Sequence, residues 1–216
     1  MIVNEIFNSI DGEGLRTGEL ATFIRLSGCN MRCSYCDTLY ALNPNSGEEL
    51  DIDEIIQRVE KYKTKNVTLT GGEPLIHKDI DLLINSLINK GYKVNIETNG
   101  SVSIEKYLNK CLITMDYKTP SSLMEKNMLL SNIEKLTEND VLKFVVNESD
   151  LDTVEKVMRN YNIKSYIYIS PIFGEIQPDK IVEFMKKMNE KEIDMGKVRV
   201  QVQLHKIIWD PNMKGV

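Results

Sequence analysis

The segment Cys29-Asn-Met-Arg-Cys33-Ser-Tyr-Cys36 places three thiols on one short loop with the spacing Cys-x3-Cys-x2-Cys. A 4Fe-4S cluster takes one sulfur ligand per iron, so three cysteines hold three irons and leave the fourth iron open to a non-protein ligand. The spacing therefore predicts an iron-sulfur cluster with one open coordination site, bound by Cys29, Cys33 and Cys36.

Other uses of these thiols stay open at this point. A structural zinc site needs a fourth protein ligand, and Cys111, His77 and His205 lack knuckle-like spacing. Three thiols within eight residues cannot all pair, and four cysteines in 216 residues are not typical of a secreted disulfide framework. Cys111 precedes an apolar pair and is predicted to be a small buried hydrophobe.

Composition sets the outer bounds. A chain of 216 residues with 42% hydrophobic content can bury one core, and no Pro/Gly/Ser-rich stretch divides it, so we predict a single domain over residues 1–216. The formal net charge of -5, without a basic tract, argues against a nucleic-acid partner. The sequence has neither an apolar run of membrane-spanning length nor a signal-peptide pattern, so a cytoplasmic protein without a membrane partner is expected.

Short β-branched runs alternate with amphipathic helical patterns, which is typical of parallel strands joined by crossover helices. A full (β/α)8 barrel typically needs about 250 residues. The predicted fold class is therefore α/β, a partial (β/α) barrel truncated relative to a full TIM barrel. Expected strands span residues 21–26, 66–70, 93–97, 112–116, 141–146, 166–170 and 198–203, and expected helices span 52–62, 80–90 and 151–161.

Local signals refine these helices. Ser149 with Asp152 three residues later resembles a capping box for the helix at 151–161, and Gly91 lies where a C-terminal cap would follow the helix at 80–90. The methionines on the apolar faces are predicted to fill the core rather than to bind a metal: Met158, Met185 and Met188.

Polar and glycine-rich segments follow several predicted strands, at the carboxyl ends where parallel sheets bind ligands. The cysteine loop follows the first predicted strand and Gly71-Gly72-Glu73-Pro74 follows the second. The two glycines allow a ligand to approach the backbone closely, and Glu73 can accept hydrogen bonds from an ammonium group. A tight turn before a helix is the alternative explanation.

Together, the cysteine triplet and the Gly-Gly-Glu-Pro segment resemble the motifs of the radical S-adenosylmethionine (SAM) superfamily. In that superfamily the amino and carboxylate groups of SAM chelate the open iron, and the Gly-Gly-Glu-Pro segment holds the amino group. The resemblance implies the partial barrel of the radical SAM type.

Four further segments look like the 7-carboxy-7-deazaguanine synthase family: residues 4–14, the strand Phe23-Ile24-Arg25-Leu26, the continuation Cys36-Asp37-Thr38, and residues 203–209. The resemblance implies a carbon-nitrogen lyase that converts 6-carboxy-5,6,7,8-tetrahydropterin to 7-carboxy-7-deazaguanine, with ring contraction and loss of ammonia, in queuosine and deazapurine biosynthesis. It further implies a 4Fe-4S cluster, SAM and Mg2+ as cofactors, flavodoxin or ferredoxin as reductant, and a homodimer. Asp11 departs from the glutamine found in many members.

The resemblance also implies a role for individual residues. Thr38 would bind magnesium through its hydroxyl oxygen. SAM would contact Tyr35, Cys36, Asp37, Gly72, Glu73, Asp116, Tyr117, Lys118, Ser170, Pro171, Ile172 and Phe173. The pterin substrate would contact Ile10, Asp11, Gly12, Glu13, Arg25, Thr70, Glu97, His205 and Val216.

Several of these assignments have ordinary alternatives. Arg25 offers a forked donor set for a carboxylate, but a surface salt bridge explains it as well. His205 is as easily a structural histidine, Val216 a frayed end, and Glu97 is open to either ligand.

Two other functions remain to be weighed. A glycyl-radical enzyme activase shares the cluster loop but acts on a protein glycine and needs no magnesium. An iron-sulfur electron-transfer or zinc-binding module would want four protein ligands and has no use for the Gly-Gly-Glu-Pro loop.

Overall fold

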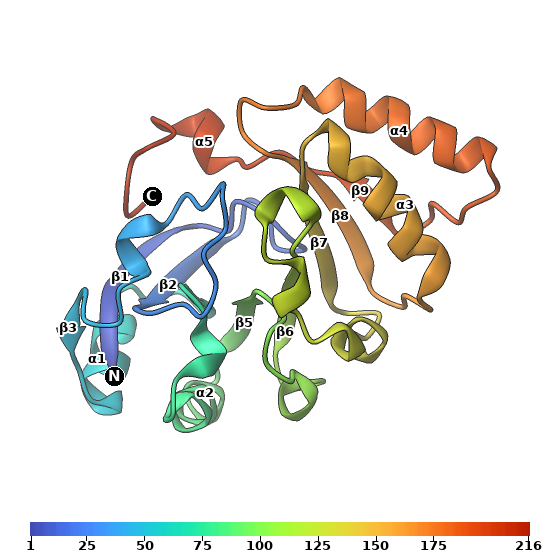
Figure 1. Cartoon of the computed structure of the whole chain (residues 1–216). Coiled ribbons are helices and arrows are strands. Elements are labelled where there is room, and N and C mark those ends of the chain that lie inside the picture. The colour runs from blue at the N-terminus through green and yellow to red at the C-terminus, as the bar shows by residue number, and fades with distance from the viewer.

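The computed structural model describes residues 1–216, which form one mixed sheet with helices packed along its outside (Figure 1). The strands lie in the order β3-β1-β2-β4-β5-β6-β7-β8-β9, and β2 and the strands from β4 to β9 run parallel. Their bounds are β1 Ile2–Ile10, β2 Leu20–Leu26, β3 Glu48–Glu49, β4 Asn66–Gly71, β5 Lys93–Thr98, β6 Leu112–Tyr117, β7 Val141–Val146, β8 Tyr166–Pro171 and β9 Val198–Val200.

Five α-helices accompany the sheet: α1 Ile52–Glu60, α2 Ile80–Asn89, α3 Leu151–Asn160, α4 Pro178–Glu190 and α5 His205–Ile208. Helix α1 begins with a capping box, in which the Asp51 carboxylate accepts from the Glu54 N–H at 2.8 Å and Glu54 accepts from the Asp51 N–H at 2.9 Å. None of the helices combines the length and apolar character that crossing a bilayer requires.

The predicted partial barrel is confirmed, because the sheet is open and its two edge strands, β3 and β9, do not pair with each other. All seven predicted strands are present, and the strand at Val141–Val146 has the predicted bounds. The last is shorter than predicted: β9 ends at Val200, because the chain then turns inward and Gln201 bonds to the segment after β1. Strands β1 and β3 are not among those predicted.

Two predicted helix caps have different outcomes. Gly91 follows α2 with φ +79°, so the C-terminal cap is confirmed. The capping box at Ser149 and Asp152 is wrong. The box is formed two residues earlier, by Asn147 and Asp150, because a 3-10 turn precedes α3.

The buried interior agrees with the predicted core residues. Cys111 is 9% exposed and packs in the core. Met188 is fully buried, while Met158 and Met185 are partly buried against the same core. These side chains therefore pack as hydrophobes, as predicted.

The direction of β1 determines where the site lies. Strand β1 runs antiparallel to β2, and Ile10 pairs with Leu20 at the start of β2. The segment after β1 therefore begins at the amino ends of the parallel strands, whereas the cysteine loop follows their carboxyl ends. Residues 12–14 lie against the middle of the sheet: Glu13 reaches Lys143 of β7, and Gly14 lies against Thr114 of β6. We call residues 11–18 the floor segment.

Candidate active site

A cavity of about 680 Å³ lies between the floor segment and the loops at the carboxyl ends of the strands. The residues predicted from the sequence that line it are Ile10, Gly12, Glu13, Arg25, Cys29, Cys33, Tyr35, Cys36, Asp37, Thr38, Thr70, Gly72, Glu97, Asp116, Lys118, Ile172, Phe173, His205 and Val216. The fold thus brings the three thiols and most of the predicted ligand contacts to one space.

The cysteine loop is held from two sides. Ser34 bonds to the 120–122 turn, with its hydroxyl donating to the Ser121 carbonyl at 2.5 Å and its N–H to the Ser122 carbonyl at 3.2 Å. On the other side Gly72 packs so closely that a Cβ there would lie 2.2 Å from the Gly28 carbonyl oxygen and 2.7 Å from the Cys29 Cβ. The loop can approach β4 only because residue 72 is glycine.

The thiols suit a cluster that takes one sulfur per iron. Cys29, Cys33 and Cys36 are unpaired and partly exposed along the cavity, and burial raises the pKa of the Cys33 and Cys36 thiols. No three His, Cys, Asp or Glu side chains are grouped closely enough to hold one metal ion. A 4Fe-4S cluster does not require such convergence, because each thiolate binds a different iron. Cluster binding would deprotonate these thiols.

The Glu73 carboxylate does not reach the cavity, contrary to the sequence-based expectation. It is fully buried and accepts from the Leu75 N–H at 3.0 Å, the Thr98 hydroxyl at 2.8 Å and the Asn99 N–H at 2.6 Å. These donors use both oxygens, so Glu73 braces the loop after β5 and leaves the ligand-facing surface to the backbone of Gly72.

At the end of β6, the Tyr117 side chain faces the opposite side of the sheet from the side chains of Asp116 and Lys118. Asp116 and Lys118 face the cavity, with the Lys118 Nζ 3.1 Å from the Asp116 carboxylate. Successive strand residues point to opposite faces. Tyr117 therefore lies in the core, where its ring packs 5.0 Å from Phe144 and its hydroxyl donates to Glu125.

Ser170 and Pro171 are likewise buried outside the cavity lining, whereas the next two residues, Ile172 and Phe173, line it. Of the predicted contacts in this loop, the structure therefore brings only the last two to the site.

Asp11 also points away from the cavity. It is 1% exposed, accepts from the Thr68 hydroxyl at 2.7 Å and lies 3.1 Å from the Arg16 Nε. Its predicted role as a substrate contact is not supported by this geometry, because its carboxylate is occupied below the floor. Its neighbour Gly12 faces the cavity under the His205 ring, where a Cβ would lie 2.6 Å from Nδ1.

Arg25 is held so that its fork remains free. Its Nε donates to the Glu5 carboxylate at 2.7 Å, and its guanidinium lies 5.8 Å from the ring centroids of both Phe7 and Tyr40. The terminal nitrogens of Arg25 have no hydrogen-bond partner within the protein. A bidentate contact with a ligand carboxylate is therefore available.

Two oxygen-bearing side chains lie next to each other at the end of the cysteine loop. The Thr38 hydroxyl donates to Asp37 at 2.9 Å, and Lys206 of α5 lies 3.1 Å from the same carboxylate. Burial would raise the pKa of Asp37, but the Lys206 ammonium and the Thr38 hydroxyl lower it to about 2. Hard oxygen donors of this kind suit Mg2+.

Glu97 lies deeper in the cavity. It accepts from the Thr70 hydroxyl at 2.8 Å, and burial raises the pKa of its carboxyl group. Glu97 thus presents a carboxyl group that gives up its proton less readily than usual.

Sequence reasoning missed several lining residues with polar side chains, among them Lys143, Asn99, Gln203 and Lys206. The sequence does contain a sign that Lys143 is functional: this charged residue interrupts the otherwise apolar strand Val141–Val146, just as Arg25 interrupts β2. Gln203 had a signal too, since it begins the segment 203–209 that resembles the family, whereas Asn99 had only its position in the polar loop after the predicted strand at 93–97.

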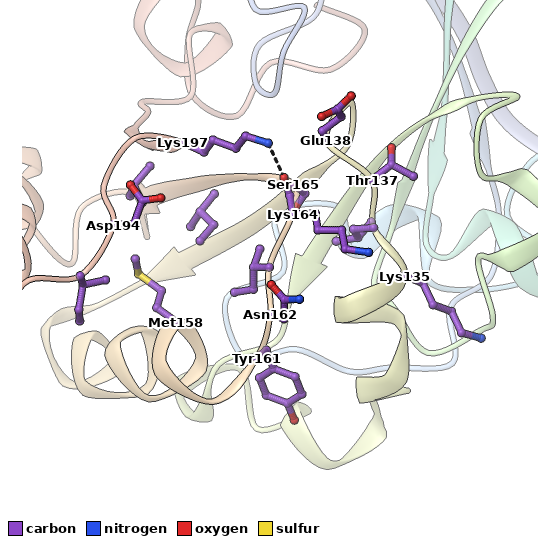
Figure 2. Close-up of a pocket in the computed structure, with 15 residues that line it drawn as sticks. Lys135, Thr137, Glu138, Met158, Tyr161, Asn162, Lys164, Ser165, Asp194 and Lys197 are labelled. Carbon is purple, nitrogen blue, oxygen red and sulfur yellow. Dashed lines mark hydrogen bonds between the residues drawn. The ribbon is translucent and has the colours of Figure 1, made fainter.

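A second cavity of about 650 Å³ lies at the amino ends of β7, β8 and β9 (Figure 2). Lys197 crosses its edge and donates to the Lys164 carbonyl at 2.7 Å (Figure 2). It contains no thiol and none of the predicted site residues, so the chemistry belongs to the first cavity.

Comparison with known proteins places the chain in a family. Residues 23–115 match the radical SAM superfamily. A 7-carboxy-7-deazaguanine synthase from Clostridium acetobutylicum is 46% identical over an alignment that covers 99% of this chain and 98% of that relative. The chain belongs to the 7-carboxy-7-deazaguanine synthase family. A second 7-carboxy-7-deazaguanine synthase, from Methanospirillum hungatei, is 39% identical over 98% of this chain and 86% of its own length.

The fold agrees with this assignment. The crystal structure of QueE from Escherichia coli matches with a TM-score of 0.69 and covers 94% of this chain and 93% of its own, at 21% identity. The predicted family and fold class are confirmed. Membership in the 7-carboxy-7-deazaguanine synthase family makes the chain a radical SAM enzyme, whose cofactors are a 4Fe-4S cluster and SAM.

Proposed function

We propose that this chain converts 6-carboxy-5,6,7,8-tetrahydropterin to 7-carboxy-7-deazaguanine with loss of ammonia. The observation that carries the proposal is one cavity that joins the cysteine triplet to a free arginine fork and several carboxyl groups. A pterin carries a carboxylate for the arginine and N–H donors for the carboxyl groups. The activase alternative is less well supported, because the synthase name belongs to relatives that align over nearly the whole chain.

Residues suited to the cofactors and residues suited to the substrate line different parts of the cavity. When bound, the cluster and SAM supply a radical that removes hydrogen from the substrate carbon. Cys29, Cys33 and Cys36 would hold the cluster, and the Gly72 backbone, Asp116 and Lys118, which line the same cavity, would orient SAM. Burial would lower the pKa of the Lys118 ammonium, but Asp116, Cys33 and Tyr35 together raise it, so Lys118 remains a cation for the SAM carboxylate.

The substrate occupies the other end. The Arg25 fork grips its carboxylate, and Glu13 and Glu97 receive its N–H groups. Thr38 would hold magnesium through its hydroxyl oxygen, and the ion would need further oxygen ligands from water or substrate. A flavodoxin or ferredoxin as reductant, a homodimer and a cytoplasmic setting complete the proposal and rest on the family resemblance.

The decisive experiment is anaerobic incubation of reconstituted protein with SAM, dithionite and the carboxytetrahydropterin, followed by mass analysis of the product. We expect 7-carboxy-7-deazaguanine from the native chain and from Cys111→Ala, the matched control, because Cys111 is buried in the core away from the cavity. Cys33→Ala should lose the cluster and the product. An active, cluster-bearing Cys33→Ala protein would refute the iron-sulfur assignment.

The dependence of turnover on magnesium tests whether Thr38 binds the ion. Chelator treatment should depress turnover while cluster content and SAM binding persist, and Thr38→Ala should respond less to added magnesium. A native rate that is indifferent to magnesium would remove the ion from the proposal.

A further inference from the structure

Lys143 is a buried cation that lines the cavity but has no role in the proposed function. It is 7% exposed and is the third residue of β7, a strand whose residues are all buried. A lysine in such a place remains charged only if counter-charges surround it, since burial of an unpaired ammonium is costly.

The counter-charges come from the two ends of the cavity. The Lys143 Nζ lies 3.1 Å from a carboxylate oxygen of Glu13, in the floor segment, and 3.6 Å from an oxygen of Asp116, in β6. Burial would lower the pKa of Lys143, but Asp116, Glu13 and the more distant Glu97 together hold it well above its ordinary value. The ammonium is thus a fixed cation between two anions.

Each of these carboxylates keeps one oxygen for another donor. Glu13 Oε1 and Asp116 Oδ1 are buried and accept no hydrogen bond from the protein. A buried carboxylate oxygen without a donor is destabilising, so oxygens of this kind fit ligand N–H or O–H groups. Glu13 faces the substrate end, and Asp116 lies beside Lys118 at the SAM end.

We propose that Lys143 is a positioning residue that holds Glu13 and Asp116 on one ammonium and so fixes the substrate and SAM sites relative to each other. The inference rests on the proposed function for the identity of the substrate. Hydrogen abstraction needs the two reacting carbons at a defined separation, and small displacements of bound reactants are costly to the rate. A rigid strand residue that touches both sites meets this need.

The test uses Lys143→Met, which has similar length and no charge, in the reconstituted holoprotein. Titrations with SAM and with the carboxytetrahydropterin should each show affinity reduced by about tenfold or more, the effect of losing a hydrogen bond to a charged group. Cluster absorbance should be retained, because Lys143 binds no cysteine. Lys143→Arg, which keeps the charge, should recover part of both affinities.

Asp140→Asn is the matched control for a purely structural effect. Asp140 is 1% exposed, directly precedes β7, bonds to the Ile113 N–H and to Thr137, and lies outside the cavity. We expect it to lower the melting temperature with unchanged affinities. Lys143→Met would overturn the proposal if it behaved in this way, or if it weakened only one of the two ligands.

Two further measurements cover the cases in which Lys143→Met does not fold or the proposed function fails. If Lys143→Met does not fold, Lys143→Met with Glu13→Gln removes one charge of each sign, and its SAM affinity should still be reduced; native SAM affinity there would overturn the proposal. If the native protein neither binds nor converts the pterin, the proposed function fails. The SAM titration then decides alone whether Lys143 positions Asp116.

Discussion

At the scale of single residues, Arg25 shows how neighbouring side chains can orient a binding group while leaving its donors free. Glu5 takes the Nε donor, and the Phe7 and Tyr40 rings lie beside the guanidinium. The side chain is therefore held in place without using its terminal nitrogens. This arrangement differs from an exposed salt bridge, because the Arg25 and Glu5 side chains are only 16% and 21% exposed.

Replacing Arg25 by Lys tests whether the guanidinium binds the substrate carboxylate. The change keeps the charge and removes the fork, so affinity for the carboxytetrahydropterin should fall by about tenfold or more, while cluster content and SAM affinity persist. Substrate titration measures the effect. Glu5→Gln, which still accepts a hydrogen bond, should give a smaller loss, and equal affinity in native and Arg25→Lys proteins would show that Arg25 does not bind the carboxylate.

Asp11 provides the opposite case, a motif residue with a structural role. Asp11→Asn leaves the Arg16 guanidinium, 11% exposed, without its counter-charge. We expect the free energy of unfolding to fall by about 3 kcal/mol, the lower end for breaking a buried ion pair. Denaturant unfolding measures it. Substrate affinity should be unchanged, and a variant of native stability that loses substrate binding would return Asp11 to the site.

At the scale of elements, α5 and the residues after it depend on tertiary contacts. A helix of only four residues is not stable by itself. Lys206 bonds to Asp37, and the Lys214 ammonium lies 4.1 Å from the Tyr40 ring centroid. Residues 211–216 line the cavity as a result.

Lys206→Met should loosen this C-terminal segment. Limited carboxypeptidase digestion should then remove the last residues faster than in the native chain, and substrate affinity should fall, because the segment lines the cavity. Lys186→Met is the control, since it breaks the exposed pair with Glu183 on α4. Identical digestion rates for Lys206→Met and its control would show that the ion pair does not hold the segment.

At the scale of the whole molecule, hydrogen bonds outside the strand pairing join the segment after β9 to the floor segment after β1. Gln201, just after β9, accepts from the Gly14 N–H at 2.8 Å and donates to the Thr17 hydroxyl at 2.6 Å. The Leu204 N–H also donates to the Gly12 carbonyl at 3.2 Å. The last strand thus holds the floor segment in place beneath the cavity.

Gln201→Ala should weaken the attachment of the floor segment to the segment after β9. Loss of partners for buried groups of the floor segment should reduce the free energy of unfolding by about 2 kcal/mol. Substrate affinity should fall more than SAM affinity, because the floor lies at the substrate end. Thr17→Val removes one of the three hydrogen bonds of the Gln201 side chain and should have a smaller effect. Equal losses of both affinities would mean that the floor does not act selectively.

Much of the fold was predictable because it is encoded in local patterns. The strand Val141–Val146 is a β-branched and apolar run interrupted only by Lys143, and Gly91 ends α2 because glycine readily adopts φ +79°. Strand β1 was missed because Asn4, Glu5 and Asn8 interrupt its apolar pattern, and its partner strand is what makes it a strand. The Glu73 side chain was misplaced because donors 25 and 26 residues away capture it.

The sequence by itself determined the cysteine triplet, the glycine approach at residue 72 and the succession of parallel strands, since each depends on residues close together in the chain. Tertiary structure alone decided that β1 runs antiparallel to β2 and carries Glu13 beneath the cavity, where Lys143, 130 residues later, meets it. Charge pairing of that kind depends on distance in space and on exclusion of water, and neither is encoded in local spacing.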